Sequence, residues 1–151
     1  RVLNVGRVSR EKNLDALCAY QKEFEITIVG DGPYLNELKQ KYQKVNFLGY
    51  KFGKELADIY AQHDIFAFPS KTDTFGIVMI DAMCNGLPVA GFRGAGPKAV
   101  IETGSTGFTG QDLQQAILLC QTLNKQTIKQ KSRSKWSWGR CFDIFWQHFH
   151  H

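Results

Sequence analysis

Two loops combine glycine with residue types that could hold a phosphate group. In the first, residues 6–13, Gly6 follows an apolar run, and the cations Arg7 and Lys12 precede a helix-like segment. Glycine lets the backbone turn without a Cβ clash, and cations near a helix N-terminus add to the anion affinity of its free N–H groups. The loop therefore predicts a phosphate site, with a solvated basic loop as the alternative.

The second loop leads into a helix and carries two acidic residues at a spacing that suits a nucleotide sugar. Gly76 lets a ligand approach the free N–H groups of the helix start, Asp73 precedes the helix, and Asp81 lies inside it. At a rise of ~1.5 Å per residue, Asp81 lies on the order of 7–8 Å beyond Gly76 along the axis. This spacing predicts a pyrophosphate at the helix tip, a sugar near Asp73 and ribose hydroxyls near Asp81.

Asp81 interrupts the run 77–83, Ile-Val-Met-Ile-Asp-Ala-Met, which is apolar enough to be buried. A buried carboxylate needs hydrogen-bond donors, and the hydroxyls of a ligand could supply them. Both acids have a structural alternative: Asp73 could be a helix N-cap, and Asp81 could pair with a neighbouring backbone group or cation.

Short apolar runs alternate with amphipathic segments, and this alternation predicts the elements that position both loops. Strands are expected at Val2–Val5, Glu25–Val29, Val45–Leu48, Asp64–Phe68 and Pro88–Phe92. Helices are expected at about Asn13–Tyr20, Pro33–Tyr42, Lys51–Gln62, Phe75–Asn85 and Gln111–Leu123, with Asn13 as an N-cap and Pro33 in a first turn. The pattern indicates an α/β fold, a Rossmann-like open parallel sheet with helices on both faces. Ligands of such sheets bind at the carboxyl ends of the strands.

The net charge and the cysteine content indicate the kind of binding partner and the cellular compartment. A formal net charge of +5 and a pI of about 9.1 favour an anionic partner without naming it. The basic segment 125–140 is expected to be a solvated connection, and binding of a membrane surface or of nucleic acid is its alternative. The four scattered cysteines predict reduced thiols of a cytoplasmic protein, not a disulfide or zinc framework; they are Cys18, Cys84, Cys120 and Cys141.

An ordered set of short motifs resembles the C-terminal domain of glycosyltransferase family 4, the glycosyl transferases group 1. These motifs are Gly6-Arg7 with Lys12-Asn13, Val29-Gly30-Asp31-Gly32-Pro33, Val45-Asn46-Phe47-Leu48-Gly49, Thr72-Asp73-Thr74-Phe75-Gly76, Asp81-Ala82-Met83 and Gly86-Leu87-Pro88-Val89. The resemblance covers about Val2 to Gly110 well and the closing aromatic segment more loosely.

The resemblance implies one half of a GT-B architecture, in which two Rossmann-like domains face each other across a cleft. Residues 1–151 would form the donor-binding domain, and 137–150 an aromatic helix that packs on an N-terminal acceptor domain absent from this chain. Because the chain begins on an apolar run at Arg1, we expect it to be a piece of a longer enzyme and inactive by itself.

The implied enzyme is a bacterial hexosyltransferase of the cytoplasm. It would move a hexose from a UDP- or GDP-sugar to a lipid or saccharide acceptor with retention of configuration. The resemblance implies no bound metal or other cofactor and no nucleic-acid partner, and it leaves open a peripheral contact with the inner face of the membrane.

The resemblance also assigns roles to residues. The implied catalytic residues are Arg7 and Lys12, which hold the diphosphate and stabilise charge on the leaving nucleotide, and Asp73, which contacts the donor sugar. Asp81 is implied to bind the ribose. The other implied donor-binding residues are Gly6, Gly49 and Tyr50, the last two near the base, and Thr74, Phe75, Gly76 and Ile77 at the helix start.

Two departures from the family pattern keep a second hypothesis open. Asp73 and Asp81 stand where the family's E-x7-E motif usually has glutamates, and no segment resembles an acceptor domain. A non-catalytic nucleotide-binding module, truncated or decayed from such an enzyme, is therefore the alternative. A nucleotide-sugar epimerase of the same fold is less favoured, because the loop 72–76 is typical of transferases.

Overall fold

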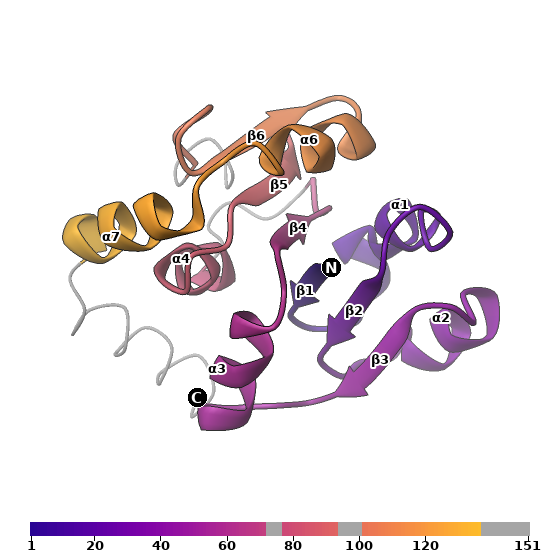
Figure 1. Cartoon of the computed structure of the whole chain (residues 1–151). Coiled ribbons are helices and arrows are strands. Elements are labelled where there is room, and N and C mark those ends of the chain that lie inside the picture. Colours follow the sequence, from indigo (N-terminus) through magenta and orange to yellow (C-terminus); the bar gives the residue numbers. More distant parts are fainter. Residues whose placement is uncertain (72–76, 94–100, 137–151) are drawn as a thin grey trace.

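The structure is a computed structural model that describes residues 1–71, 77–93 and 101–136 (Figure 1). It contains one six-stranded sheet in which every pair of neighbouring strands is parallel. The strands are β1 (Val2–Val5), β2 (Ile26–Val29), β3 (Asn46–Gly49), β4 (Ile65–Phe68), β5 (Val89–Phe92) and β6 (Gly107–Gly110). The predicted Rossmann-like open parallel sheet is confirmed. The predicted aromatic helix 137–150 lies outside the described residues.

The strand order is β3-β2-β1-β4-β5-β6, so the direction of winding reverses between β1 and β4. In open α/β sheets, ligands bind in the crevice beyond the carboxyl ends of the strands at such a reversal. Five of the six strands match the predicted ones. The strand at the edge, β6, was not predicted, because its sequence Gly-Phe-Thr-Gly has a single large apolar residue.

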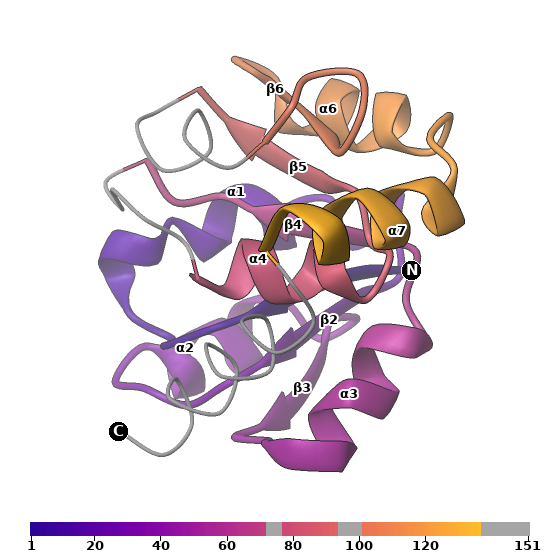
Figure 2. The same ribbon diagram turned by 90° about the vertical axis from the view of Figure 1, so that its left-hand side faces the viewer.

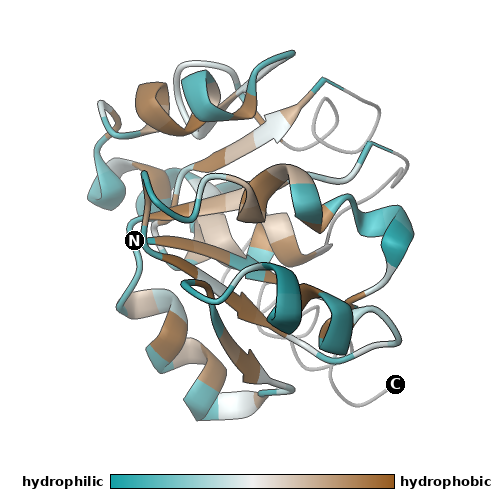
Figure 3. Ribbon diagram, turned by 90° about the vertical axis from the view of Figure 1, so that its right-hand side faces the viewer, coloured by the Kyte–Doolittle hydropathy of each residue, from teal (hydrophilic) through white to brown (hydrophobic). Residues whose placement is uncertain are grey.

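Helices cover both faces of the sheet, as predicted (Figures 1 and 2). One face carries α1 (Leu14–Cys18), α2 (Leu35–Lys41) and α6 (Leu113–Cys120), and the other carries α3 (Gly53–Ala61), α4 (Ile77–Cys84) and α7 (Lys125–Trp136). Each set forms its own apolar core against the sheet. In Figure 3 the strands are mostly hydrophobic, whereas the helices mix hydrophobic and hydrophilic residues. No helix in the described part of the chain is long and apolar enough to span a membrane.

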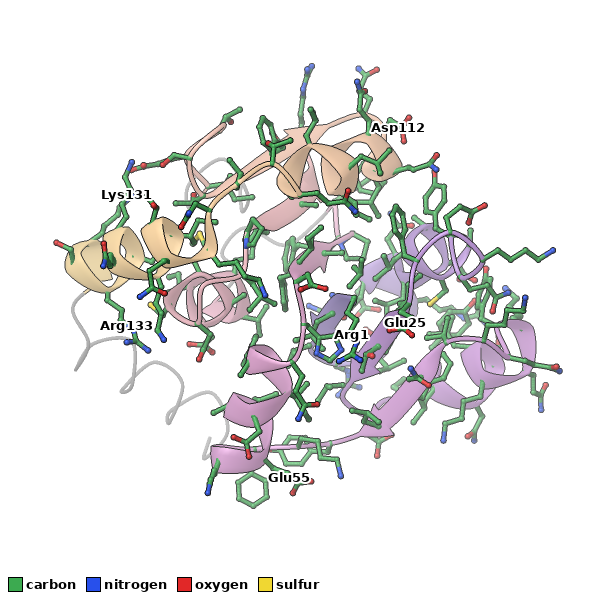
Figure 4. The ribbon with its side chains drawn as sticks, viewed as in Figure 1. Arg1, Glu25, Glu55, Asp112, Lys131 and Arg133 are labelled. Atoms are coloured by element: carbon green, nitrogen blue, oxygen red, sulfur yellow. The ribbon has the colours of Figure 1, made fainter. Side chains whose placement is uncertain are left out.

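Helix α7 replaces the solvated connection that was predicted for the basic segment, so that prediction is wrong for 125–136. The helix lies against α4 (Figure 2). Its residues Ile128 and Ser132 are buried. Its cations make specific contacts: Arg133 Nε donates to the Cys84 carbonyl oxygen at 3.0 Å, and Lys131 forms an ion pair with Glu102 (Figure 4). A single buried isoleucine gives too weak a periodic signal to predict a helix that tertiary contacts stabilise.

Candidate functional site

The loop after β1 is held by backbone hydrogen bonds to the loop after β2. The Gly6 N–H donates to the Val29 carbonyl at 3.0 Å, and the Val8 N–H donates to the Asp31 carbonyl at 3.0 Å. The Tyr34 N–H then donates to the Val8 carbonyl at 3.1 Å. The first predicted phosphate loop is therefore fixed at the carboxyl ends of β1 and β2, where a ligand of this fold would lie.

Two glycines make this close approach possible. A Cβ atom at Gly30 would lie 1.8 Å from the Gly6 carbonyl oxygen, and one at Gly32 would lie 2.1 Å from the Val8 carbonyl oxygen. Gly30 also has a φ of +141°, which L side chains rarely adopt. The Gly30-Asp31-Gly32 motif is thus explained by backbone packing between the two loops.

Arg10 anchors the same loop on its outer side. Its guanidinium donates to both carboxylate oxygens of Glu37, at 2.8 and 3.0 Å, and lies 4.6 Å from the centre of the Tyr34 ring. The Tyr34 hydroxyl in turn donates to Asp15 at 2.6 Å. Arg10 is therefore engaged with α2, whereas the predicted phosphate ligand Arg7 lies elsewhere in the loop.

A pocket of about 540 Å³ opens at the carboxyl ends of the first three strands. It brings together Gly6, Arg7 and Tyr50, which the sequence predicts to share one site. The full lining among the described residues is Val5, Gly6, Arg7, Val29, Gly30, Asp31, Tyr50 and Lys51. Asp31 and Lys51 were not predicted as site residues, although each follows a strand end closely enough to have been considered.

An exposed aromatic pair lies at one side of this pocket. Tyr50 and Phe52 are each 53% exposed, and their ring centres lie 5.9 Å apart. Gly49, with a φ of +76°, turns the chain just before them, and its carbonyl accepts a hydrogen bond from the Gly30 N–H at 2.9 Å. Exposed rings beside a pocket offer a planar base a stacking surface.

Asp81 is buried in the core formed by α4 and its neighbours, as the sequence predicts. The residue is 2% exposed, and neither carboxylate oxygen has a hydrogen-bond partner among the described residues. Burial raises the pKa of Asp81 to about 8. The Tyr60 hydroxyl is also buried, with no hydrogen-bond partner in the same described part of the chain. Burial, with a smaller contribution from the Asp81 charge, raises the pKa of Tyr60 well above its usual value. The predicted structural pairing of Asp81 is not found in the described part of the chain.

This burial has a consequence for ligand binding. Both carboxylate oxygens of Asp81 are closed off from solvent, so a ribose hydroxyl reaches them only after a local movement admits it. Unpartnered buried acids are expensive in a protein core and concentrate at functional sites. Asp81 therefore stays a candidate donor residue, but it does not line the pocket that contains Arg7.

The remaining predicted residues divide into two groups. Lys12 is half-buried in a short 3-10 turn, Arg10–Lys12, and Ile77 begins α4. Four predicted residues lie outside the described residues: Asp73, Thr74, Phe75 and Gly76.

Asn13 lies at the predicted N-cap position of α1, but the predicted capping by its side chain is wrong. Its backbone is left-handed, with a φ of 59° and a ψ of 34°, and its side chain makes no cap hydrogen bond. The amide Nδ2 donates instead to the carbonyl oxygen of Pro69 at 2.9 Å, far along the chain. The predicted first-turn role of Pro33 is also wrong by a small margin, because α2 begins at Leu35.

The described residues include two free, buried cysteines and no group that could hold a metal ion. Cys18 and Cys120 are free, and burial raises the pKa of each thiol to about 12. Cys84 is disulfide-bonded, so the prediction of a reduced thiol is wrong at that position. Among residues 1–71, 77–93 and 101–136, no three His, Cys, Asp or Glu side chains form a group that could hold a metal ion.

A family model and several known proteins are similar to this chain in sequence. The family model "Glycosyl transferases group 1" matches residues 1–123. The chain is 37% identical over 114 residues to a sulfoquinovosyl transferase of Arabidopsis thaliana, covering 72% of this chain and 22% of that protein. It is 36% identical over 106 residues to a GDP-mannose-dependent alpha-mannosyltransferase of Mycobacterium tuberculosis, covering 69% of this chain and 28% of that protein.

A solved structure has the same fold. The Anabaena protein HepE, in complex with UDP, superimposes with a TM-score of 0.71 at 20% identity over 97% of this chain and 47% of its own. The chain thus spans less than a third of the two curated relatives and about half of this structure. With its ordered motifs, its parallel sheet and the match over residues 1–123, the chain belongs to the glycosyl transferases group 1 family, whose members adopt the GT-B architecture.

Proposed function

We propose that this chain is the donor-binding domain of a retaining glycosyltransferase that needs no metal. The enzyme would move a hexose from a UDP- or GDP-sugar to a lipid or saccharide acceptor. The observation that carries the proposal is the pocket at the carboxyl ends of β1–β3, which combines Arg7 with the exposed ring of Tyr50. A cation and a stacking surface are what a nucleoside diphosphate requires.

In this proposal Arg7 and Lys12 hold the diphosphate. As the bond from the sugar to the nucleotide breaks, negative charge develops on the departing phosphate oxygen. Fixed cations stabilise that charge in place of a metal ion, and they do so without transferring a proton. The packing of Gly30 and Gly32 against the loop keeps its backbone from shifting as the charge develops.

The remaining roles follow the family. Asp73 contacts the hydroxyls of the donor sugar, and Asp81 accepts from the ribose after the local movement described above. The relatives named above include a mannosyltransferase that depends on GDP-mannose and a fold neighbour bound to UDP, which is why both bases are proposed. Because the chain spans less than a third of its curated relatives, the acceptor would be bound mainly by another domain.

Calorimetric titration of this chain with UDP, GDP and their hexose conjugates tests the proposal. We expect one nucleotide to bind, and we expect Arg7→Ala to weaken it by about tenfold or more, since a hydrogen bond to a charged group contributes about 1.5–3 kcal/mol. Sugar transfer by the chain alone should not be detected.

Lys39→Ala is the matched control, because it removes one positive charge from an exposed position on α2, outside the lining of the pocket. It should leave the affinity nearly unchanged. A folded wild-type chain that binds no nucleotide would sink the proposal, as would equal losses of affinity in Arg7→Ala and Lys39→Ala.

A further inference from the structure

The strands on either side of the reversal in the sheet pair over a short distance. β1 and β4 are in register only at Val2 with Ile65 and at Leu3 with Phe66. Beyond these pairs, two asparagine side chains take over the contact. Asn4 Nδ2 donates to the Ala67 carbonyl at 2.9 Å, and Asn13 Nδ2 donates to the Pro69 carbonyl at 2.9 Å.

The alternation of a strand explains why these two carbonyls need donors. The Ile65 N–H donates toward β1, to the Arg1 carbonyl, whereas the Phe66 N–H donates toward β5, to the Pro88 carbonyl. The backbone N–H and carbonyl groups of every second residue of β4 therefore point toward β1. The carbonyls of Ala67 and Pro69 also point toward β1, but they lie beyond the last paired residues of the two strands. Both residues are buried, where an unpaired carbonyl is costly.

Asn13 meets two requirements at once. Among the described residues it is the one non-glycine with a positive φ, at 59°. Asparagine tolerates this left-handed conformation better than most residues. Glycine would also tolerate it, but glycine has no side-chain amide that could donate to the Pro69 carbonyl. Alanine would supply neither the conformation nor the hydrogen bond.

We infer that Asn13 is a positioning residue that holds the loop with Arg7 and Lys12 at a fixed separation from the chain that leaves β4. The inference rests on the proposed function for its effect on the donor, since those two cations are its diphosphate ligands. Asn13 directly follows Lys12 in sequence, and its bond ends at Pro69, the first residue after β4. It touches no reacting group and acts through the loop.

Asn13→Gly isolates the side-chain bond, because glycine keeps the left-handed backbone and deletes the amide. The first readout needs no ligand: exchange of the Ser70 and Lys71 backbone amides with solvent, followed by NMR. The second is the affinity for UDP and GDP by calorimetry. We expect amide exchange to be about threefold to tenfold faster and the affinity of the bound nucleotide to fall by a similar factor, the range of one neutral hydrogen bond.

Asn124→Ala is the matched control, because it also deletes a side-chain to backbone bond: the Thr127 N–H donates to Asn124 Oδ1 at 3.0 Å. Its loss should lower global stability without changing exchange at Ser70 and Lys71 or nucleotide affinity. Asn13→Asp should be worse than Asn13→Gly, because a carboxylate would face the Pro69 carbonyl.

The two readouts separate the inference from the proposed function. Unchanged exchange at Ser70 and Lys71 in Asn13→Gly would overturn the positioning role, whatever the ligand does. Faster exchange with unchanged affinity would overturn its link to the donor site. A wild-type chain that binds neither UDP nor GDP would refute the proposed function, while the exchange measurement would still decide whether Asn13 positions the segment after β4.

Discussion

Replacing Asp81 by asparagine should stabilise the protein progressively, relative to the wild type, as the pH rises from 4 to 7. Burial raises the pKa of Asp81 to about 8 from the ordinary value of 3.8. Between these values the folded state keeps a proton that the unfolded state has lost, so the contribution of Asp81 to stability falls as pH rises through this window. Asparagine is neutral throughout.

Between the unfolded and folded pKa values, each unit of pH changes the free energy of unfolding of the wild type by about 1.4 kcal/mol. From pH 4 to pH 7 the difference between the unfolding free energies of variant and wild type should shift by about 4 kcal/mol in favour of Asp81→Asn. Urea denaturation at a series of pH values measures it. Parallel pH profiles for the two proteins would show that Asp81 has a hydrogen-bonded, ionised carboxylate instead.

Asp15→Asn provides a control of opposite sign. Burial raises the pKa of Asp15, but hydrogen bonds from Tyr34, Tyr42 and Lys41 outweigh it and hold the pKa below the ordinary value. The contribution of this carboxylate is therefore present above its unfolded pKa and is lost as pH falls. As pH rises, the wild type should become more stable relative to Asp15→Asn and less stable relative to Asp81→Asn.

Gly30→Ala should be among the most destabilising single substitutions in this chain. The new Cβ atom would lie 1.8 Å from the Gly6 carbonyl oxygen, and alanine would have to adopt a φ of +141°. Overpacking costs about 1–3 kcal/mol and a left-handed backbone about 1–2 kcal/mol, so we expect a loss of about 3 kcal/mol or more. Nucleotide binding should disappear as well, because Gly6 and Arg7 must move with the loop.

Two further glycine substitutions separate the causes. Gly104 has a φ of +81° and nothing within 4 Å of a Cβ, so Gly104→Ala measures the backbone cost alone. At Gly32, a Cβ would lie 2.1 Å from the Val8 carbonyl oxygen, so Gly32→Ala measures mainly the clash. Chemical denaturation of the three variants should rank Gly30→Ala as the most costly. If it costs no more than Gly104→Ala, the two loops can separate easily and the rigid-loop explanation is wrong.

The sequence predicts the architecture well because local patterns dominate it. The buried strands β1, β2, β4 and β5 are short, mostly apolar runs between loops, and such runs are visible without tertiary information. β6 and α7 fail this condition. β6 contains one large apolar residue, Phe108, and α7 has one buried isoleucine, Ile128, so both elements depend on contacts with their neighbours, β5 and α4.

The sequence predicts some parts of the candidate site and misses others, because it shows local patterns but not tertiary contacts. Gly6, Arg7 and Tyr50 come together because they follow strand ends, which a parallel sheet places along one edge. The burial of Asp81 follows from its apolar neighbours in α4. The bond from Asn13 to Pro69 could not be predicted, because it joins residues far apart in the chain and uses a left-handed backbone that a local N-cap rule does not consider.

The strand order also constrains how the chain can assemble during synthesis. β1 is a central strand, and its two neighbours are made later: Val2 pairs with Ile26 on one side and with Ile65 on the other. Until Ile65 has left the ribosome, one edge of an apolar strand lacks its partner, and unpaired edges recruit other chains. We expect nascent chains that end before β4 to be the species that aggregate or recruit chaperones.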